Sequence, residues 1–340
     1  AYGKAVSEND NASGQLYVKR SDQRNAHYSL ALIPFAGDVT ISNLTIAGNV
    51  SCKIPKTVKQ EEKDIRSPAF AAGAIGLASG TTAFNHVTVN TNVSVTEETG
   101  ANKLLAWQGG FLARCEGSTL SFTDCTWGSG ASLDDERGTD NHRIGGLAAE
   151  VMGGCTVTVN DSVLSGSITS KSTANANIGG LIAVSRGEDS GNKSRLTTIN
   201  IANLKVNGEK LTASAAVTSG GLLGYQWKNT NVVFAAPTEG SESAGTDAGT
   251  NNGVTISGSA LDAKNAQFGG LVYQATGYWN ATAKDSIVFS NGDNQANTFT
   301  GKSEEDTPSG LLVGTALITE TNENQTNTIV ESALYLEVGT

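Results

Sequence analysis

The sequence predicts an all-β protein, a right-handed parallel β-helix of about eight coils with long corner loops. Three observations predict this fold: a composition suited to short strands and tight turns, a Gly-Gly-hydrophobic step that recurs, and a strand–bend–strand motif that follows the step. Of the 340 residues, 40 are Gly and 16% are charged, against roughly 25% charged in an average soluble domain. No apolar run approaches the ~18 residues that would span a membrane.

The Gly-Gly-hydrophobic step marks a repeat. Complete copies begin at Gly109, Gly145, Gly179, Gly220 and Gly269. Ile75-Gly76-Leu77 and Ser309-Gly310-Leu311 are read as degenerate copies, which gives spacings of 34, 36, 34, 41, 49 and 40 residues. A fixed unit with loop insertions explains this pattern. Glycine is expected here because a side chain at this bend would clash with the neighbouring coil.

The strand–bend–strand motif places a polar residue between two hydrophobic stretches. Its bend positions are Asn43, His86, Asp124, Asp161 and Asn203. Asn and Asp suit a bend because they tolerate left-handed backbone. Alternation along the strands predicts an inner face that carries Ile41, then Leu44 and Ile46.

Each repeat therefore supplies about three short strands and three turns, a unit that cannot bury its own apolar face. Stacking such units about 4.8 Å apart builds parallel sheets and a continuous core. The prediction for that core is a column of like residues formed by Leu147, Leu181, Leu222 and Leu271. The right hand follows from the general preference of parallel crossovers. A β-propeller has repeats of similar length, but its antiparallel blades fit this motif less well.

Two regions are predicted. Residues 1–36 form an N-terminal cap or first imperfect coil, and residues 37–340 form the β-helix repeats. The first residue is Ala1 rather than Met, so we expect either a removed signal peptide or a fragment. The strand-like end around Leu334 and Leu336 predicts end-to-end self-association or continuation into a larger protein.

Charge and cysteine content restrict the partners. The net charge is −10 and the isoelectric point is near 4.9, so nucleic acid and an anionic membrane surface are not expected partners. The four cysteines show no C-x-x-C spacing. They are either four small buried hydrophobes or include one disulfide, Cys115–Cys125.

The charged residues allow three chemical interpretations. Asp134–Arg143 is the densest charged segment and is either a solvated corner loop or a calcium loop, although it lacks the usual spacing of a calcium loop. Asp124 and Asp161 occupy matching positions in consecutive repeats, as the two carboxylates of a hydrolase would. Asn43, His86 and Asn203 share that position, which favours a role in the bend. We therefore expect no catalytic, cofactor or metal residue.

Aromatic residues provide the candidate ligand site. The candidates are Tyr225, Trp227, Tyr273, Tyr278 and Trp279. Their side chains either point outward and form a sugar-binding platform or point inward and pack in the core. Long insertions between repeats are further candidates, because scaffolds of this kind carry function on such loops. These insertions are Cys52–Pro68, Gly128–His142, Pro237–Gly253 and Asn291–Pro308.

A family resemblance adds a cellular context. Val159-Asn-Asp161-Ser162-Val-Leu164-Ser-Gly166-Ser-Ile168, followed by Asn177-Ile178-Gly179-Gly180-Leu181-Ile182, resembles the GLUG repeat of large bacterial cell-surface proteins. The closing Gly of that repeat is missing in most copies. The resemblance implies an extracellular adhesin module, secreted or on the cell surface, that binds a host or matrix glycan or protein or serves as a stalk. It transfers no catalytic residue. The alternative is a polysaccharide-active hydrolase or lyase on the same scaffold.

Overall fold

The computed structural model describes residues 4–5, 16–19, 26–54, 58–60, 63–65, 69–97, 105–137, 142–172, 176–190, 193–213, 217–234, 253–263, 268–281, 286–290, 297–300, 309, 312–316, 328–329 and 334–336. Across these residues the chain forms strands and turns and no helix. A search of the same residues finds no helix that could cross a membrane.

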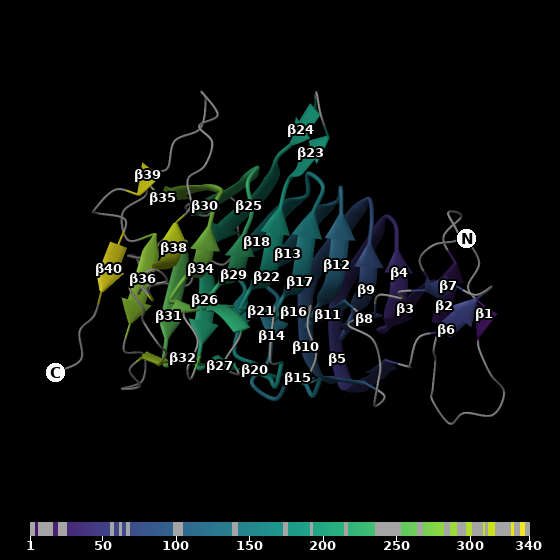
Figure 1. Cartoon of the computed structure of the whole chain (residues 1–340). Helices are drawn as coiled ribbons and strands as arrows, with labels where there is room; N and C mark the ends of the chain where they lie inside the picture. The colour runs from purple at the N-terminus through teal and green to yellow at the C-terminus, as the bar shows by residue number, and fades with distance from the viewer. Residues whose placement is uncertain are drawn as a thin grey trace.

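Two parallel sheets, named A and B here, run the length of the molecule (Figure 1). Sheet A consists of β1 (Lys4–Ala5), β2 (Leu16–Lys19), β3 (Ala26–Leu30), β8 (Ala69–Ala72), β11 (Ala106–Gly109), β16 (His142–Gly145), β21 (Ala176–Gly179), β28 (Val217–Gly220) and β33 (Phe268–Gly269). Sheet B consists of β4 (Ile33–Ala36), β9 (Ile75–Ala78), β12 (Leu112–Glu116), β17 (Ala148–Met152), β22 (Ile182–Arg186), β29 (Leu223–Gln226), β34 (Val272–Ala275) and β38 (Val313–Ala316).

The third sheet, C, is bent and contains three columns of short strands. Its first two strands, β5 (Val39–Ile54) and β10 (Thr81–Glu97), run through all three columns without a break. The first column continues with β13 (Thr119–Thr123), β18 (Thr156–Asn160), β25 (Thr197–Ala202), β30 (Thr230–Phe234), β35 (Tyr278–Ala281) and β39 (Thr328–Ile329). The second column continues with β14 (Thr126–Trp127), β19 (Val163–Leu164), β26 (Leu204–Asn207), β31 (Val254–Ser257), β36 (Ile287–Ser290) and β40 (Leu334–Leu336). The third continues with β15 (Ser132–Asp135), β20 (Ser167–Ser170), β27 (Lys210–Thr212), β32 (Ala260–Asp262) and β37 (Thr298–Thr300).

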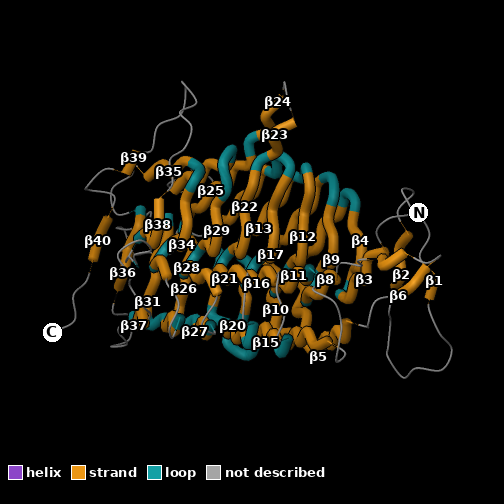
Figure 2. The backbone as a smooth tube through the Cα atoms, viewed as in Figure 1, coloured by secondary structure: helices purple, strands orange, loops and turns teal. Residues whose placement is uncertain are grey.

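This arrangement is a parallel β-helix, as the sequence predicts. Each turn of the chain passes through sheet A, sheet B and the columns of sheet C, and it pairs in parallel with the turn before it, for example β12 with β17 and β13 with β18. Figure 2 shows the turns stacked along one axis, with the bends aligned at the corners. The right hand and the number of about eight coils stay predictions.

Two hairpins and the N-terminal strands depart from the parallel pattern. β6 (Val58–Gln60) pairs with β7 (Lys63–Ile65), and β23 (Glu188–Ser190) pairs with β24 (Lys193–Arg195), both antiparallel. The second hairpin projects from the body beyond β22 (Figure 1). In the predicted cap, β1, β2 and β3 pair antiparallel, and β3 then joins β8 in parallel.

The predicted bend ladder is confirmed. All five bend residues have left-handed backbone, with φ between 49° and 55°. Their side chains interact between coils: His86 Nε2 lies 3.3 Å from Asp124 Oδ2, and Asn203 Nδ2 donates a hydrogen bond of 2.6 Å to Asp161 Oδ1. The bend therefore turns the chain from the first to the second column of sheet C. It also explains the one-residue change of register in the motif.

Replacement of Asp161 tests the bend. We expect Asp161→Val to lower the free energy of unfolding by about 1–2 kcal/mol more than Asp161→Gly does, because only the β-branched residue is strained at positive φ. Both variants lose the contact with Asn203, so the difference isolates the backbone. Urea unfolding of the two variants measures it, and equal stabilities would contradict a left-handed bend.

The Gly-Gly step is confirmed, and its physical basis is close approach rather than unusual dihedral angles. A Cβ at the first glycine, such as Gly145, would lie against the carbonyl oxygen three residues later, that of Ala148. A Cβ at the second, such as Gly146, would lie against the carbonyl oxygen of Gly180 in the next coil. Each pair therefore makes room for its own strand and for the coil above it.

The predicted register of the first degenerate copy is wrong. Ile75 pairs with Leu112, so Gly73 rather than Gly76 occupies the position of Gly110. The second copy, at Gly310 and Leu311, lies outside the described residues. In the first copy a short apolar sequence could be aligned in two ways, and only the strand pairing decides between them.

The predicted leucine column is confirmed. All four leucines are buried, and backbone hydrogen bonds connect them in order from Leu147 N–H to the Leu181 carbonyl oxygen (2.9 Å), from Leu181 to Leu222 (3.0 Å) and from Leu222 to Leu271 (2.8 Å). One expected inner residue is an exception, since 41% of Leu44 is exposed. Leu44 lies on β5, the first strand of sheet C, and its counterparts Val87 and Leu204 in later coils are buried. Leu44 is more exposed because, among the described residues, β5 is the end strand of sheet C and is covered by a coil on one side only.

The predicted insertions are only partly loops. Within Gly128–His142, the strand β15 pairs with β10 and β20 and belongs to the coil, and within Asn291–Pro308 the strand β37 pairs with β32. Residues 237–252 lie outside the described part of the chain. At the C-terminal end, β40 pairs in parallel with β36. Self-association or continuation beyond this strand stays a prediction.

The cysteines are all free and buried, which confirms the first of the two interpretations and makes the Cys115–Cys125 disulfide wrong. Cys125 Sγ instead donates a hydrogen bond to the Phe84 carbonyl oxygen (3.3 Å). The nearest sulfur to Cys115 is that of Cys155 in the next coil, at 3.1 Å.

Candidate ligand-binding site

The outer face of sheet B carries an unusual set of charged residues. In β12, β17 and β22 the residues that face the core are apolar or small, whereas Arg114, Glu150 and Arg186 point away from it. Arg114 pairs with Glu150 in the parallel ladder, and Arg186 pairs with Met152 two residues beyond Glu150. Arg143, from β16 of sheet A, reaches the same place. The coil therefore gathers charges from four strands.

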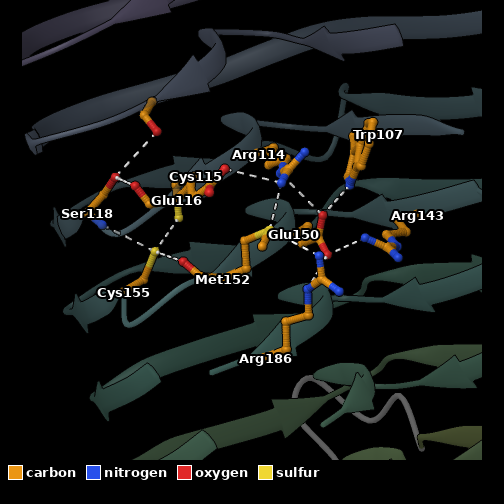
Figure 3. Close-up of polar contacts among 11 residues, drawn as sticks. Trp107, Arg114, Cys115, Glu116, Ser118, Arg143, Glu150, Met152, Cys155 and Arg186 are labelled. Carbon is orange, nitrogen blue, oxygen red and sulfur yellow. Dashed lines mark hydrogen bonds and ion pairs between the residues drawn. The ribbon is translucent and has the colours of Figure 1, made fainter. Parts of the chain in front are cut away.

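Glu150 is the centre of this group, which we call the arginine cluster: Trp107, Arg114, Arg143, Glu150 and Arg186 (Figure 3). Its carboxylate is fully buried and accepts a hydrogen bond from Trp107 Nε1 (2.6 Å). Arg114 Nε lies 3.4 Å from Oε2, Arg186 Nε lies 3.3 Å from Oε1, and Arg143 Nη1 pairs with Oε1. One carboxylate thus holds three guanidinium groups from three successive coils.

Trp107 forms the base of the cluster. Its ring stacks on Phe70 with centroids 4.9 Å apart, and the guanidinium carbons of Arg114 and Arg143 lie 5.0 and 5.6 Å from the ring centroid. These distances are in the range of cation–π interactions. Phe70 and Trp107 are buried, so the arginines and not the aromatic rings form the surface at this point.

The cluster has an excess of positive charge. Three arginines face Glu150 and one exposed acid, Glu116, whose Oε2 lies 3.2 Å from Arg114 Nη2. Burial lowers the pKa of Arg143, which the neighbouring Glu150 opposes and Arg186 and Arg114 reinforce. The arginine side chains repel one another, and an added anion would relieve that repulsion. This surplus contrasts with the net charge of −10 of the whole chain.

The five predicted aromatic residues do not form one platform. Trp279 is buried in the core, where its Nε1 donates to Gln226 Oε1, and Tyr278 is buried as well. Tyr273 is almost completely buried. Tyr225 is half-buried, and Trp227 is 44% exposed. The inward alternative therefore describes Trp279, and the outward one describes Tyr225 and Trp227.

Tyr225 and Trp227 extend the arginine cluster along sheet B. Their rings are 5.1 Å apart; Tyr225 lies on β29 and Trp227 is the first residue after it. Val184 pairs with Tyr225 and Ser185 with Gln226, so Arg186 and Trp227 are neighbours in adjacent coils. Burial, and then Tyr273, raises the pKa of Tyr225. We call Arg186, Tyr225 and Trp227 the binding face.

Of the Asp134–Arg143 segment, the structure describes residues 134–137 and 142–143, and these are more buried than a solvated corner loop would be; residues 138–141 lie outside the described part. Asp135, Arg137 and His142 are buried in the corner between β15 and β16. Asp135 Oδ2 lies 2.6 Å from His142 Nδ1 and accepts a hydrogen bond from Ser170 Oγ (2.8 Å). Among the described residues, no group of three or more His, Cys, Asp or Glu side chains could hold a metal ion. Alternation along β15 explains the inward direction of Asp135, since Leu133 also points inward.

A further buried acid, Glu209, lies in the turn between β26 and β27. Its carboxylate lies where a Cβ on Gly180 would be, inside the coil. Burial raises the pKa of Glu209 well above its ordinary value of 4.5, so folding favours the neutral form of this acid.

This buried acid makes stability depend on pH. Because the folded pKa is raised, the stabilising contribution is complete below about pH 4.5 and is lost as pH rises toward the folded value, by about 1.4 kcal/mol per pH unit. We expect Glu209→Gln to gain stability relative to the wild type between pH 5 and pH 8. Urea unfolding at several pH values measures this, and parallel curves for the two proteins would contradict a neutral Glu209.

Sequence reasoning missed the arginine cluster, although a signal was present. Arg114 and Glu150 each stand four residues after the second glycine of their step, and Trp107 and Arg143 each stand two residues before the first glycine. Residues at equal offsets stack in adjacent coils, and opposite charges in such a column predict an ion pair. No family model matches the chain, and no curated protein matches it. The GLUG resemblance therefore stays a prediction.

Proposed function

We propose that this chain is an extracellular ligand-binding module of a bacterial surface protein, of the adhesin type, which engages a host or matrix glycan or protein through the binding face. The observation that carries this proposal is the exposed Trp227, which directly follows β29, is tied by its N–H to the Ser185 carbonyl oxygen of β22, and lies beside Tyr225 and Arg186. Trp, Tyr and Arg are the residues most enriched in binding hot spots. The rigid coil holds them in place before a ligand arrives.

The exposed face favours this function over that of a passive stalk. A stalk requires only a stable coil, and a half-exposed Trp contributes little to that stability. Trp227 is one of three large hydrophobic residues that are exposed in the described part of the chain, with Leu32 and Leu44. Secretion and a position on the cell surface agree with this role and rest on the repeat resemblance.

An array of glycans and matrix proteins tests the proposal. We expect the wild type to bind a subset of the array and Trp227→Ala to lose at least tenfold in affinity for that subset. Leu44→Ala removes an exposed apolar side chain at the far end of the coil and should change nothing. Binding that Trp227→Ala retains, or no binding to any member, would contradict the proposal.

The same samples decide the alternative of a polysaccharide-active enzyme. Asp124 and Asp161 lie in the bend ladder with His86 and Asn203, which accounts for both acids without a catalytic role. Incubation with acidic and neutral polysaccharides should therefore release no new reducing ends and no unsaturated products. Their appearance at ordinary turnover would replace the binding module with an enzyme.

A further inference from the structure

We propose that the binding face recognises a carboxylated saccharide, one with uronic or sialic acid units, with Arg186 as the contact for the carboxylate and Trp227 as the surface for the sugar ring. This rests on the proposed function, because it names the ligand class of the same face. Two observations carry it: the surplus of arginine on one carboxylate, and the position of Trp227 one coil beyond Arg186.

Arg186 is the arginine best placed to meet a ligand. Its side chain is 35% exposed, against 16% for Arg114 and 18% for Arg143. Its Nε faces Glu150, and its Nη2 lies 3.3 Å from Met152 Sδ. A guanidinium has five N–H donors in a planar fork that matches a carboxylate. Arg114 pairs with Glu150 Oε2, and Arg143 shares Oε1 with Arg186, so Glu150 stays paired when Arg186 shares its charge with an incoming anion.

The spacing suits one sugar residue. The Trp227 N–H donates to the Ser185 carbonyl oxygen (2.9 Å), which fixes Trp227 beside Arg186 across a single inter-strand distance of about 4.8 Å. In uronic and sialic acids the carboxyl carbon is bonded directly to the pyranose ring. One unit can therefore place its apolar ring face on Trp227 while its carboxylate meets Arg186. A neutral sugar would stack on Trp227 but would not neutralise the excess positive charge of the arginines.

A matched pair of polymers tests this inference. Polygalacturonate and its fully methyl-esterified form share one backbone and differ in the free carboxylate, and polysialic acid supplies a second acid. We expect the wild type to bind at least one of the two acids at least tenfold more tightly than the ester, with an affinity that falls as salt rises. Arg186→Gln should remove this preference, and Arg186→Lys should restore only part of it.

The controls separate folding, this inference and the proposed function. Arg195→Gln, on the exposed hairpin β23–β24, should bind like the wild type, and thermal melts should confirm that each variant folds. Equal affinity for acid and ester, no binding to either acid, or a preference that survives in Arg186→Gln would overturn the inference. If Trp227-dependent binding to neutral glycans or to proteins persists in that case, the proposed function still stands. If the array also stays empty, both fail.

A second inference rests on a separate observation: we infer that Cys115 and Cys155 close to a disulfide between two coils when the protein folds under oxidising conditions. Their sulfur atoms are 3.1 Å apart in the core (Figure 3). The Cys155 sulfur also accepts a hydrogen bond from Ser118 N–H (3.4 Å).

The chemistry requires a disulfide oxidant such as oxidised glutathione. The thiolate of one cysteine attacks one of the oxidant's sulfur atoms and releases a glutathione thiolate; the other cysteine, after loss of its proton, attacks the protein-bound sulfur of the mixed disulfide and releases the second glutathione thiolate. The two thiols lose two electrons and two protons, and the oxidant gains them as two glutathione thiols. Both cysteines are buried in the folded chain, so the exchange takes place before the coils close.

Peptide mapping tests the disulfide. After refolding with oxidised glutathione and alkylation in denaturant, we expect the peptides of Cys115 and Cys155 to be linked and those of Cys52 and Cys125 to carry the alkyl group. The oxidised protein should melt several degrees above the reduced one. Cys115→Ser should abolish the link, and Cys52→Ser should leave it intact. Free thiols at both positions, or a link to Cys52 or Cys125, would overturn the inference.

Discussion

Replacement of Leu181 by Asp is expected to lower the free energy of unfolding by about 4 kcal/mol or more, enough to unfold a marginally stable protein. Leu181 is fully buried, with Leu147 and Leu222 in the coils on either side. An aspartate there would be charged, without a partner and removed from water. The leucine cannot be displaced outward, because its own backbone is bonded to both neighbouring coils.

The same substitution at Leu44 is the matched control. Leu44 is 41% exposed on the first strand of sheet C, so Leu44→Asp should cost less than about 1 kcal/mol. Chemical denaturation of the two variants, with circular dichroism to confirm β-structure, measures the difference. If Leu181→Asp were as stable as Leu44→Asp, the leucine column would not be the core of the coil.

Replacement of Gly146 by Ala is expected to have the second-largest effect, about 3 kcal/mol. The new Cβ would meet the carbonyl oxygen of Gly180 and the ring of Trp127, and neither can move away easily. Backbone atoms of the next coil would have to shift, and that displacement would be passed along the stack. A single methyl group should thus destabilise the protein as much as the loss of a large core side chain.

Gly130 offers a control of the same chemistry. Nothing lies within 4 Å of a Cβ built on Gly130, so Gly130→Ala should be neutral or slightly stabilising. The free energy of unfolding of both variants should be measured under one condition. Equal values would mean that the Gly-Gly step serves a purpose other than close packing of coils.

The repeat made the fold predictable from sequence. The bend residues could be recognised because each coil needs left-handed backbone at the same position, as at Asn43 and Asp161. The Gly-Gly pairs could be recognised because each coil needs a residue without a side chain at the step, as at Gly146. The misassigned register at Gly76 arose where the step is degenerate. The exposure of Leu44 depends on where the stack ends, which alternation within one strand does not encode.

Only the aromatic part of the candidate site could be predicted from the sequence. Trp227 and Tyr225 were recognised as aromatic residues near a step, but their outward direction, and the inward one of Trp279, follow from which face of each strand the coil buries. The arginine cluster depends on contacts between coils about 36 residues apart, and each strand alone contributes only one member of the cluster. Aligning the coils by their glycines would have brought Arg114 and Glu150 together.

The most direct test of the binding face is collisional quenching of tryptophan fluorescence by acrylamide. Of the four tryptophans, Trp107, Trp127 and Trp279 are buried and Trp227 is exposed, so one accessible component is expected, and Trp227→Phe should remove it. Whichever of polygalacturonate and polysialic acid the wild type binds should protect that component at saturation, and methyl-esterified polygalacturonate should not. Protection that depends on Trp227 and on the free carboxylate is the predicted result. Quenching that persists in Trp227→Phe, or that none of the three polymers changes, would contradict the account.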